Sequence, residues 1–155
     1  MFTHQLFEIQ ARAIPDNVAV VDEAQALSYG ERDRRANQLA HRLRSLGVTP
    51  EVPVGVCMER SLELVIGMVG LLKAGGVYVP LDPSNPKERL AFIMNETQPR
   101  VLLTQERLLN CLRDVGAPTA ICLDRDWSTV STESSDLVEN LTGDGNLGFL
   151  IYTSG

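Results

Sequence analysis

Residues 71–83 have the sequence LLKAGGVYVPLDP. Lys73 stands where the last turn of a helix would place a cation at the negative end of the helix dipole. Gly75 can adopt the left-handed conformation that closes a helix. Residues 77–79 are β-branched or aromatic, which is typical of a buried strand. Pro80 has no N–H to donate to a sheet ladder, so the strand should end there. The stretch therefore predicts a helix, a two-glycine turn and a short buried strand.

The alternation of helix and strand continues on both sides of this stretch. A helix that ends by Ile14 precedes a hairpin, and later strands alternate with amphipathic or apolar segments. We expect strands at 17–21, 26–28, 52–57, 101–103, 119–123 and 146–152, with helices between Ser28 and Gly47, at 62–72, between Asn85 and Pro99 and at 105–115. This order predicts an α/β fold with a parallel or mixed sheet and helices on both faces. Residues 124–145 have no clean period and indicate a surface loop.

Composition excludes several classes of protein. The chain has 155 residues, of which 44% are hydrophobic and 22% are charged, as in an ordinary globular domain. Its net charge of −6, without a basic run, argues against nucleic acid and anionic membranes as partners. The most apolar window, 62–72, is shorter than the roughly 20 residues of a membrane span. No secretory leader pattern opens the chain, and we expect a cytoplasmic location.

The three cysteines are Cys57, Cys111 and Cys122. Their number is odd and no pair has C-x-x-C spacing, so neither a disulfide framework nor a zinc site is predicted. We expect free and mostly buried thiols in a reducing compartment. The two histidines lack the spacing of a metal pair, and we expect no metal ligand in this chain.

Three segments resemble one enzyme family. Residues 71–90, LLKAGGVYVPLDPSNPKERL, closely resemble the second core motif of the adenylation domains of non-ribosomal peptide synthetases, which belong to the adenylate-forming superfamily with acyl-CoA synthetases and luciferases. Residues 27–31 and 35–40 resemble the first core motif. Arg32 stands where the family usually has leucine, so we expect looser packing there, and we expect the arginine-rich face of this helix to be solvated.

The end of the chain carries the one candidate binding site. An apolar strand, 146–152, leads into Thr153-Ser154-Gly155. Backbone N–H groups and hydroxyls after a strand can converge on phosphate oxygens, although so short a run alone is also compatible with an ordinary turn. The segment LGFLIYTSG resembles the opening of the third core motif, with Phe149 where tyrosine is commoner. That resemblance implies that Thr153, Ser154 and Gly155 begin the loop that holds the phosphates of ATP.

The resemblance implies that residues 1–155 form the incomplete N-terminal portion of an AMP-binding adenylation domain, ending at the start of the phosphate loop. The implied parent is an ATP-dependent ligase that forms an aminoacyl adenylate and pyrophosphate with Mg²⁺. It then passes the acyl group to phosphopantetheine on a peptidyl carrier domain, beside a condensation domain. No position of this chain matches a catalytic residue of the family, so we expect the isolated chain to be inactive. The alternatives are an acyl-CoA ligase fragment and a non-catalytic scaffold or interaction polypeptide.

Overall fold

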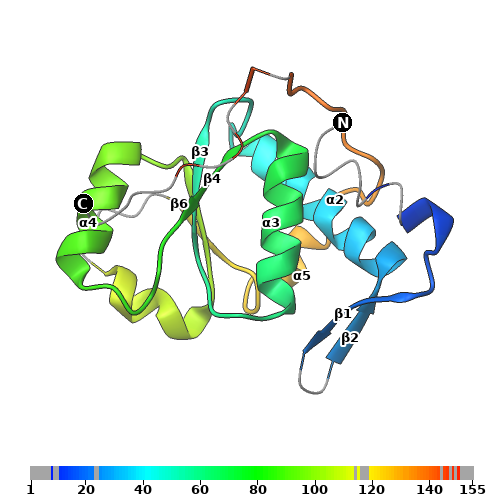
Figure 1. Ribbon diagram of the computed structural model, residues 1–155, viewed down its shortest axis with the longest axis horizontal. Helices are drawn as coiled ribbons and strands as arrows, with labels where there is room; N and C mark the ends of the chain where they lie inside the picture. The colour runs from blue at the N-terminus through cyan, green and yellow to red at the C-terminus, as the bar shows by residue number, and fades with distance from the viewer. Residues whose placement is uncertain are drawn as a thin grey trace.

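A computed structural model describes residues 8, 11–22, 25–113, 115, 119–143, 145, 146, 148 and 150 of the chain. Strands and helices alternate through these residues, and helices flank a central sheet (Figure 1). The elements in chain order are β1 (Val18–Asp22), β2 (Gln25–Ser28), α2 (Tyr29–Ser45), β3 (Pro53–Cys57), α3 (Leu62–Ala74), β4 (Val77–Pro80), α4 (Lys87–Thr97), β5 (Val101–Thr104), the 3₁₀ helix η1 (Glu106–Leu112), β6 (Thr119–Cys122) and α5 (Trp127–Val130). The predicted α/β class is confirmed.

The central sheet has the strand order β4-β3-β5-β6, and all its pairs are parallel. Val54 of β3 lies opposite Tyr78 on one side and Val101 on the other. β1 and β2 form a separate antiparallel hairpin, which projects beside α2 in Figure 1. Of the two predicted forms, parallel or mixed, the described central sheet has the parallel one, and the antiparallel hairpin lies outside it.

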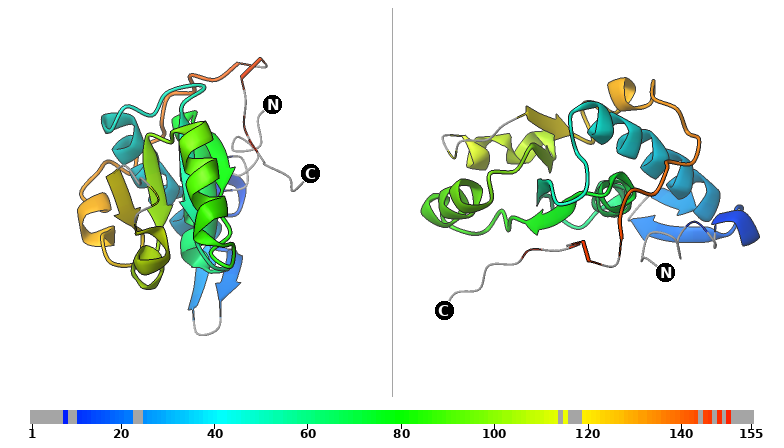
Figure 2. Two further views of the ribbon diagram at one scale, coloured as in Figure 1. Left: turned by 90° about the vertical axis from the view of Figure 1, so that its left-hand side faces the viewer. Right: turned by 90° about the horizontal axis from the view of Figure 1, so that it is seen from above.

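Helices cover both faces of the sheet, as the sequence predicts (Figures 1 and 2). Val101 and Leu103 of β5 pack into a core with α2 and α3, whereas Leu102 between them packs into a second core with α4 and η1. This alternation follows from the period of two in a strand. Because both faces are covered, β5 is buried at all four of its positions.

The turn after α3 has the predicted form. Gly75 caps the helix in the left-handed conformation, with φ of 93°. A Cβ on Gly76 would lie 2.9 Å from Cγ1 of Val48, so the chain passes too close there for a side chain. The helix is capped by Ser61, whose Oγ accepts from the amide of Leu64 over 3.2 Å.

The predicted solvated face of α2 is corrected by the structure. Asn37, Gln38 and His41 bond to backbone carbonyl groups of residues 131–136, so that segment covers part of this face. Arg34 is exposed, as expected. Arg32 is only 3% exposed, and its guanidinium lies 4.9 Å from the centre of the Tyr29 ring. An arginine thus fills the position at which we expect looser packing.

Two further expectations can be compared with the described residues. Glu8 and residues 11–13 are helical, and the helix ends before Pro15 as predicted. Cys57 and Cys122 are buried and Cys111 is partly buried, all three as free thiols. In the part of the chain that the structure describes, no helix is both long enough and apolar enough to cross a bilayer.

Candidate functional site

The carboxyl edge of a parallel sheet is the usual ligand site of an open α/β fold, at the point where neighbouring strands send their connections to opposite faces. Here that point lies between β3 and β5, because α3 covers one face and η1 the other. Gln105 follows β5 and is 4% exposed. Its Oε1 accepts from the amide of Glu59 over 3.0 Å, and its Nε2 donates to Oγ of Ser61 over 3.3 Å. The protein's own polar groups therefore occupy this crevice.

Two charged side chains pair with each other at the edge of the same crevice. Arg107 pairs with the carboxylate of Glu59, across β3 and β5. Below them, the hydroxyl of Thr104 donates to the carbonyl of Cys57 over 2.8 Å. Because each of these groups already has a partner, the geometry favours the other end of the carboxyl edge, beside β4, as the place for a ligand.

The outer side of β4 is hydrogen-bonded to Gly148 and Leu150, near the end of the chain. The amide of Tyr78 donates to the carbonyl of Gly148 over 2.8 Å, and the amide of Leu150 donates to the carbonyl of Tyr78 over 2.9 Å. Tyr78 thus donates to one residue and accepts from the residue two positions further along the same segment. This is the hydrogen-bond pattern of two parallel segments. The direction from Gly148 to Leu150 is thus toward the carboxyl edge, at which β4 ends at Pro80.

Thr153, Ser154 and Gly155 lie outside the described residues, as does Phe149. The structure therefore leaves their role in phosphate binding a prediction. What it supplies is the position and direction of the chain at Gly148 and Leu150, just before those three residues.

Asp82 lies beyond the end of β4, at this same edge of the sheet. Its Oδ1 accepts from the amide of Ser84 over 2.9 Å and from the Ser84 hydroxyl over 2.7 Å. These hydrogen bonds, the amide first, hold the pKa of the Asp82 carboxyl below its usual value. Sequence reasoning gave Asp82 no role, although an Asp side chain often accepts from the backbone amide two residues further on, and so forms a turn. The described contacts make it the residue that fixes the turn after β4.

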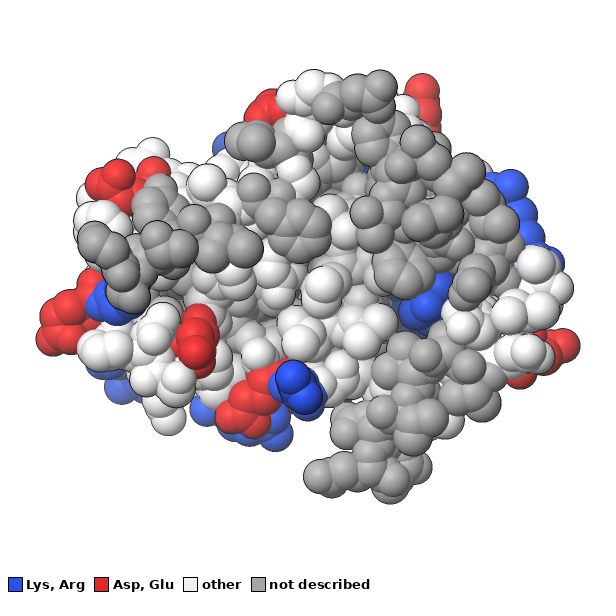
Figure 3. All heavy atoms as spheres, in the orientation of Figure 1, with Lys and Arg blue, Asp and Glu red and all other residues white. Residues whose placement is uncertain are grey.

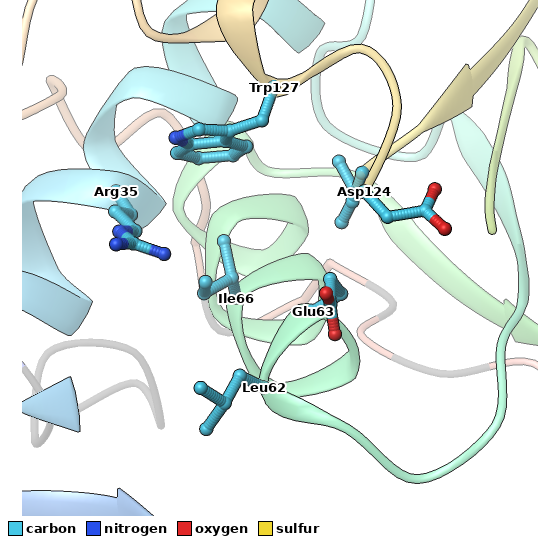
Figure 4. Close-up of a pocket in the computed structure, with 7 residues that line it drawn as sticks. Arg35, Leu62, Glu63, Ile66, Asp124 and Trp127 are labelled. Atoms are coloured by element: carbon cyan, nitrogen blue, oxygen red, sulfur yellow. The ribbon is translucent and has the colours of Figure 1, made fainter. Parts of the chain in front are cut away.

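A separate pocket of about 200 Å³ opens at the far end of the sheet from β4 (Figure 4). Trp127 of α5 lies over it, and Glu63 and Ile66 reach it from α3. The guanidinium of Arg35, from α2, lies 5.8 Å from the centre of the Trp127 ring. Its walls come from elements distant in the chain, so no local pattern in the sequence could have indicated it. Its walls combine the charged side chains of Arg35, Glu63 and Asp124 with apolar ones.

Charged side chains are mixed over the face drawn in Figure 3. Acidic and basic groups alternate around its edge, and the described residues gather no area of a single sign there.

A family model described as "AMP-binding enzyme" matches residues 7–155. The chain belongs to the AMP-binding enzyme family. The predicted resemblance to the adenylate-forming enzymes of non-ribosomal peptide synthesis is confirmed by its relatives. The chain is 50% identical over 152 residues to a linear gramicidin synthase subunit of Brevibacillus parabrevis, covering 98% of this chain and 3% of that protein. It is 44% identical to a mycosubtilin synthase subunit of Bacillus subtilis, covering 98% of this chain and 6% of that one.

Solved structures of this family share the fold. The non-ribosomal peptide synthetase FmoA3 in its α-methyl-L-serine-AMP bound form matches with a TM-score of 0.91 and 33% identity, over 99% of this chain and 17% of that one. VinN in complex with L-aspartate matches with a TM-score of 0.89 and 25% identity, over all of this chain and 41% of that one. This chain of the AMP-binding family therefore spans a small part of the proteins that it resembles.

Proposed function

We propose that residues 1–155 are the N-terminal portion of an amino-acid-activating adenylation domain of a non-ribosomal peptide synthetase. The parent protein would join an amino acid to ATP, releasing pyrophosphate, and then transfer the aminoacyl group to a phosphopantetheine thiol. The observation that carries this proposal is the parallel pairing of Gly148 and Leu150 with Tyr78, immediately before the residues that match the phosphate loop. Membership of the AMP-binding family and the names of the relatives support it.

In this proposal Thr153, Ser154 and Gly155 begin the loop that binds the phosphates of ATP. Their backbone amides and hydroxyls would donate to phosphate oxygens, which neutralises charge as the carboxylate attacks the α-phosphorus. β4 has a positioning role, because its outer side holds the strand that leads into the loop. Among the described residues, no three His, Cys, Asp or Glu side chains come together as metal ligands, and we assign Mg²⁺ no ligand there.

The partners proposed for the parent protein are an amino acid, a peptidyl carrier domain bearing phosphopantetheine, and a condensation domain. We propose a cytoplasmic location for it. The acyl-CoA ligase alternative is less well supported, since the relatives named above belong to peptide synthases. A non-catalytic scaffold is the remaining alternative, and the following experiment separates all three.

The parent protein is purified, and exchange of labelled pyrophosphate into ATP is measured with each amino acid, and with fatty and aryl acids plus coenzyme A. We expect exchange that depends on one amino acid or a few. In the same protein, replacing Thr153 and Ser154 together by alanine should raise KM for ATP, whereas the matched pair Ser134→Ala and Ser135→Ala, on an exposed segment, should not. Exchange only with fatty or aryl acids would favour the acyl-CoA ligase. No exchange with any acid would favour the scaffold.

A further inference from the structure

Lys73 carries a fully buried charge. It has no part in the phosphate binding proposed above. Its side chain is 0% exposed, and its ammonium nitrogen lies 2.9 Å from Oε1 of Glu8 and 2.8 Å from Oδ1 of Asp33. Removing either partner from such a cluster is costly, because a buried charge loses its compensation. Glu8 belongs to the helical start of the described chain, Asp33 to α2 and Lys73 to the end of α3. The cluster of Glu8, Asp33 and Lys73 therefore joins three segments at one point.

The backbone at the end of α3 is held at the same place. Arg44 of α2 donates from Nε to the carbonyl of Ala74 and from Nη2 to the carbonyl of Lys73, both over 3.3 Å. These carbonyls are among the last of the helix, which have no partner within it. Gly75 and Gly76 then turn the chain directly into β4. With so short a connection, a shift of the end of α3 is passed on to β4.

The segment before the phosphate loop rests on this turn and on β4. A Cβ on Gly75 would lie 3.3 Å from Cγ2 of Thr142, which places that threonine against the turn. Asn146 bonds to Glu51 over 2.9 Å, and Gly148 and Leu150 bond to Tyr78. Contacts therefore run without a gap from the buried ammonium, through the turn and β4, to Leu150.

We propose that Lys73 is a positioning residue for ATP binding. Through its ion pair with Lys73, Glu8 on the helical segment at the start of the described chain (the entering segment) sets the placement of the phosphate loop. The inference rests on the proposed function. An apolar residue at position 73 could pack against α2, but it could not bind a carboxylate on the entering segment. The buried ion pairs thus make the position of β4, and with it that of Gly148 and Leu150, depend on Glu8 being in place.

The experiment uses the complete adenylation domain of the parent protein, with Glu8→Gln, Asp33→Asn and Lys73→Met. The matched control is Glu96→Gln, which makes the same change at an exposed position on α4. For each variant, KM for ATP, KM for the amino acid, kcat and Tm are measured. We expect Glu8→Gln and Asp33→Asn each to raise KM for ATP about fivefold or more, the lower end of typical coupling between sites, with KM for the amino acid unchanged. In the Lys73→Met background, Glu8→Gln should have no further effect on KM for ATP.

A purely structural cluster would lower Tm in the variants and leave KM for ATP at the value of Glu96→Gln, and that result overturns the proposal. If either Glu8→Gln or Asp33→Asn does not fold, KM for ATP of the other variant is compared with that of Glu96→Gln. Binding of a non-hydrolysable ATP analogue is measured in parallel. An unmutated domain that exchanges no pyrophosphate contradicts the proposed function. An active domain in which the variants keep the control's KM contradicts only the role of Lys73.

Discussion

At the scale of single residues, the three thiols differ in their surroundings and should differ in reactivity. Burial, with the neighbouring Cys111 thiol as a lesser cause, raises the pKa of Cys57 to about 12. Because the thiolate is the nucleophile, only about one in ten thousand Cys57 side chains would be reactive at pH 8. Burial also raises the pKa of Cys122. We expect iodoacetamide at pH 8 to label the partly exposed Cys111 first in the folded adenylation domain, as measured by mass spectrometry of peptides. Labelling of Cys57 as fast as Cys111 would contradict this expectation.

Some features of single residues could be predicted from the residues next to them in the sequence. Gly75 was expected in the left-handed conformation and has it, because the signal for a helix end lies within a few residues of the position. The partners of Lys73 were not predictable. Sequence position indicated only a cation at a helix end, whereas Glu8 is 65 residues away and becomes a neighbour only through the fold. Arg32 was misjudged for the same reason, since the contact of its guanidinium with Tyr29 and its burial depend on packing.

At the scale of elements, the two capped helices offer a matched comparison. Oγ of Ser28 accepts from the amide of Glu31 at the start of α2, whereas Oγ of Ser61 accepts from Leu64 and also from the buried amide group of Gln105. Ser28→Ala should lower the free energy of unfolding by about 1 kcal/mol, as for a lost cap. Ser61→Ala should cost a further ~1–3 kcal/mol, because it also leaves a buried donor unsatisfied. Denaturant unfolding of the adenylation domain measures both, and equal losses would show that Gln105 finds another acceptor.

The types of the elements were predictable, and their order in the sheet was not. Alternating strands and helices indicated helices on both faces, and both cores exist. The order β4-β3-β5-β6 depends on which face each connection crosses, for which the residues carry no local signal. Residues 105–115 have helical spacing, but the structure forms only the 3₁₀ helix η1 there. Leu108 and Leu112 of η1 still pack into the second core, as their spacing predicted.

At the scale of the whole molecule, a strand at 146–152 was predicted from its apolar run, but its neighbour was not. The bonds of Gly148 and Leu150 to Tyr78 place these two residues beside β4, and the rest of the strand stays a prediction. In the described sheet β4 is the edge strand farthest from β6. Tyr78 of the motif at 71–90 therefore lies beside Gly148 and Leu150 of the motif at 147–155, which spacing along the chain alone could not establish.

A polypeptide of residues 1–155 alone should behave differently from the complete adenylation domain. Among the described residues, Ile14, Leu137 and Leu141 are large apolar side chains that are 38%, 52% and 44% exposed, and no described strand pairs with the outer edge of β6. Exposed apolar groups and an open strand edge favour association. We expect the 155-residue polypeptide to elute as oligomers or aggregates in size-exclusion chromatography with light scattering, and to exchange no pyrophosphate with any amino acid. The complete domain, run in the same buffer, is the control and should be monomeric and active. A sharp monomer peak with cooperative melting would contradict the association, and amino-acid-dependent exchange by the polypeptide would contradict its inactivity.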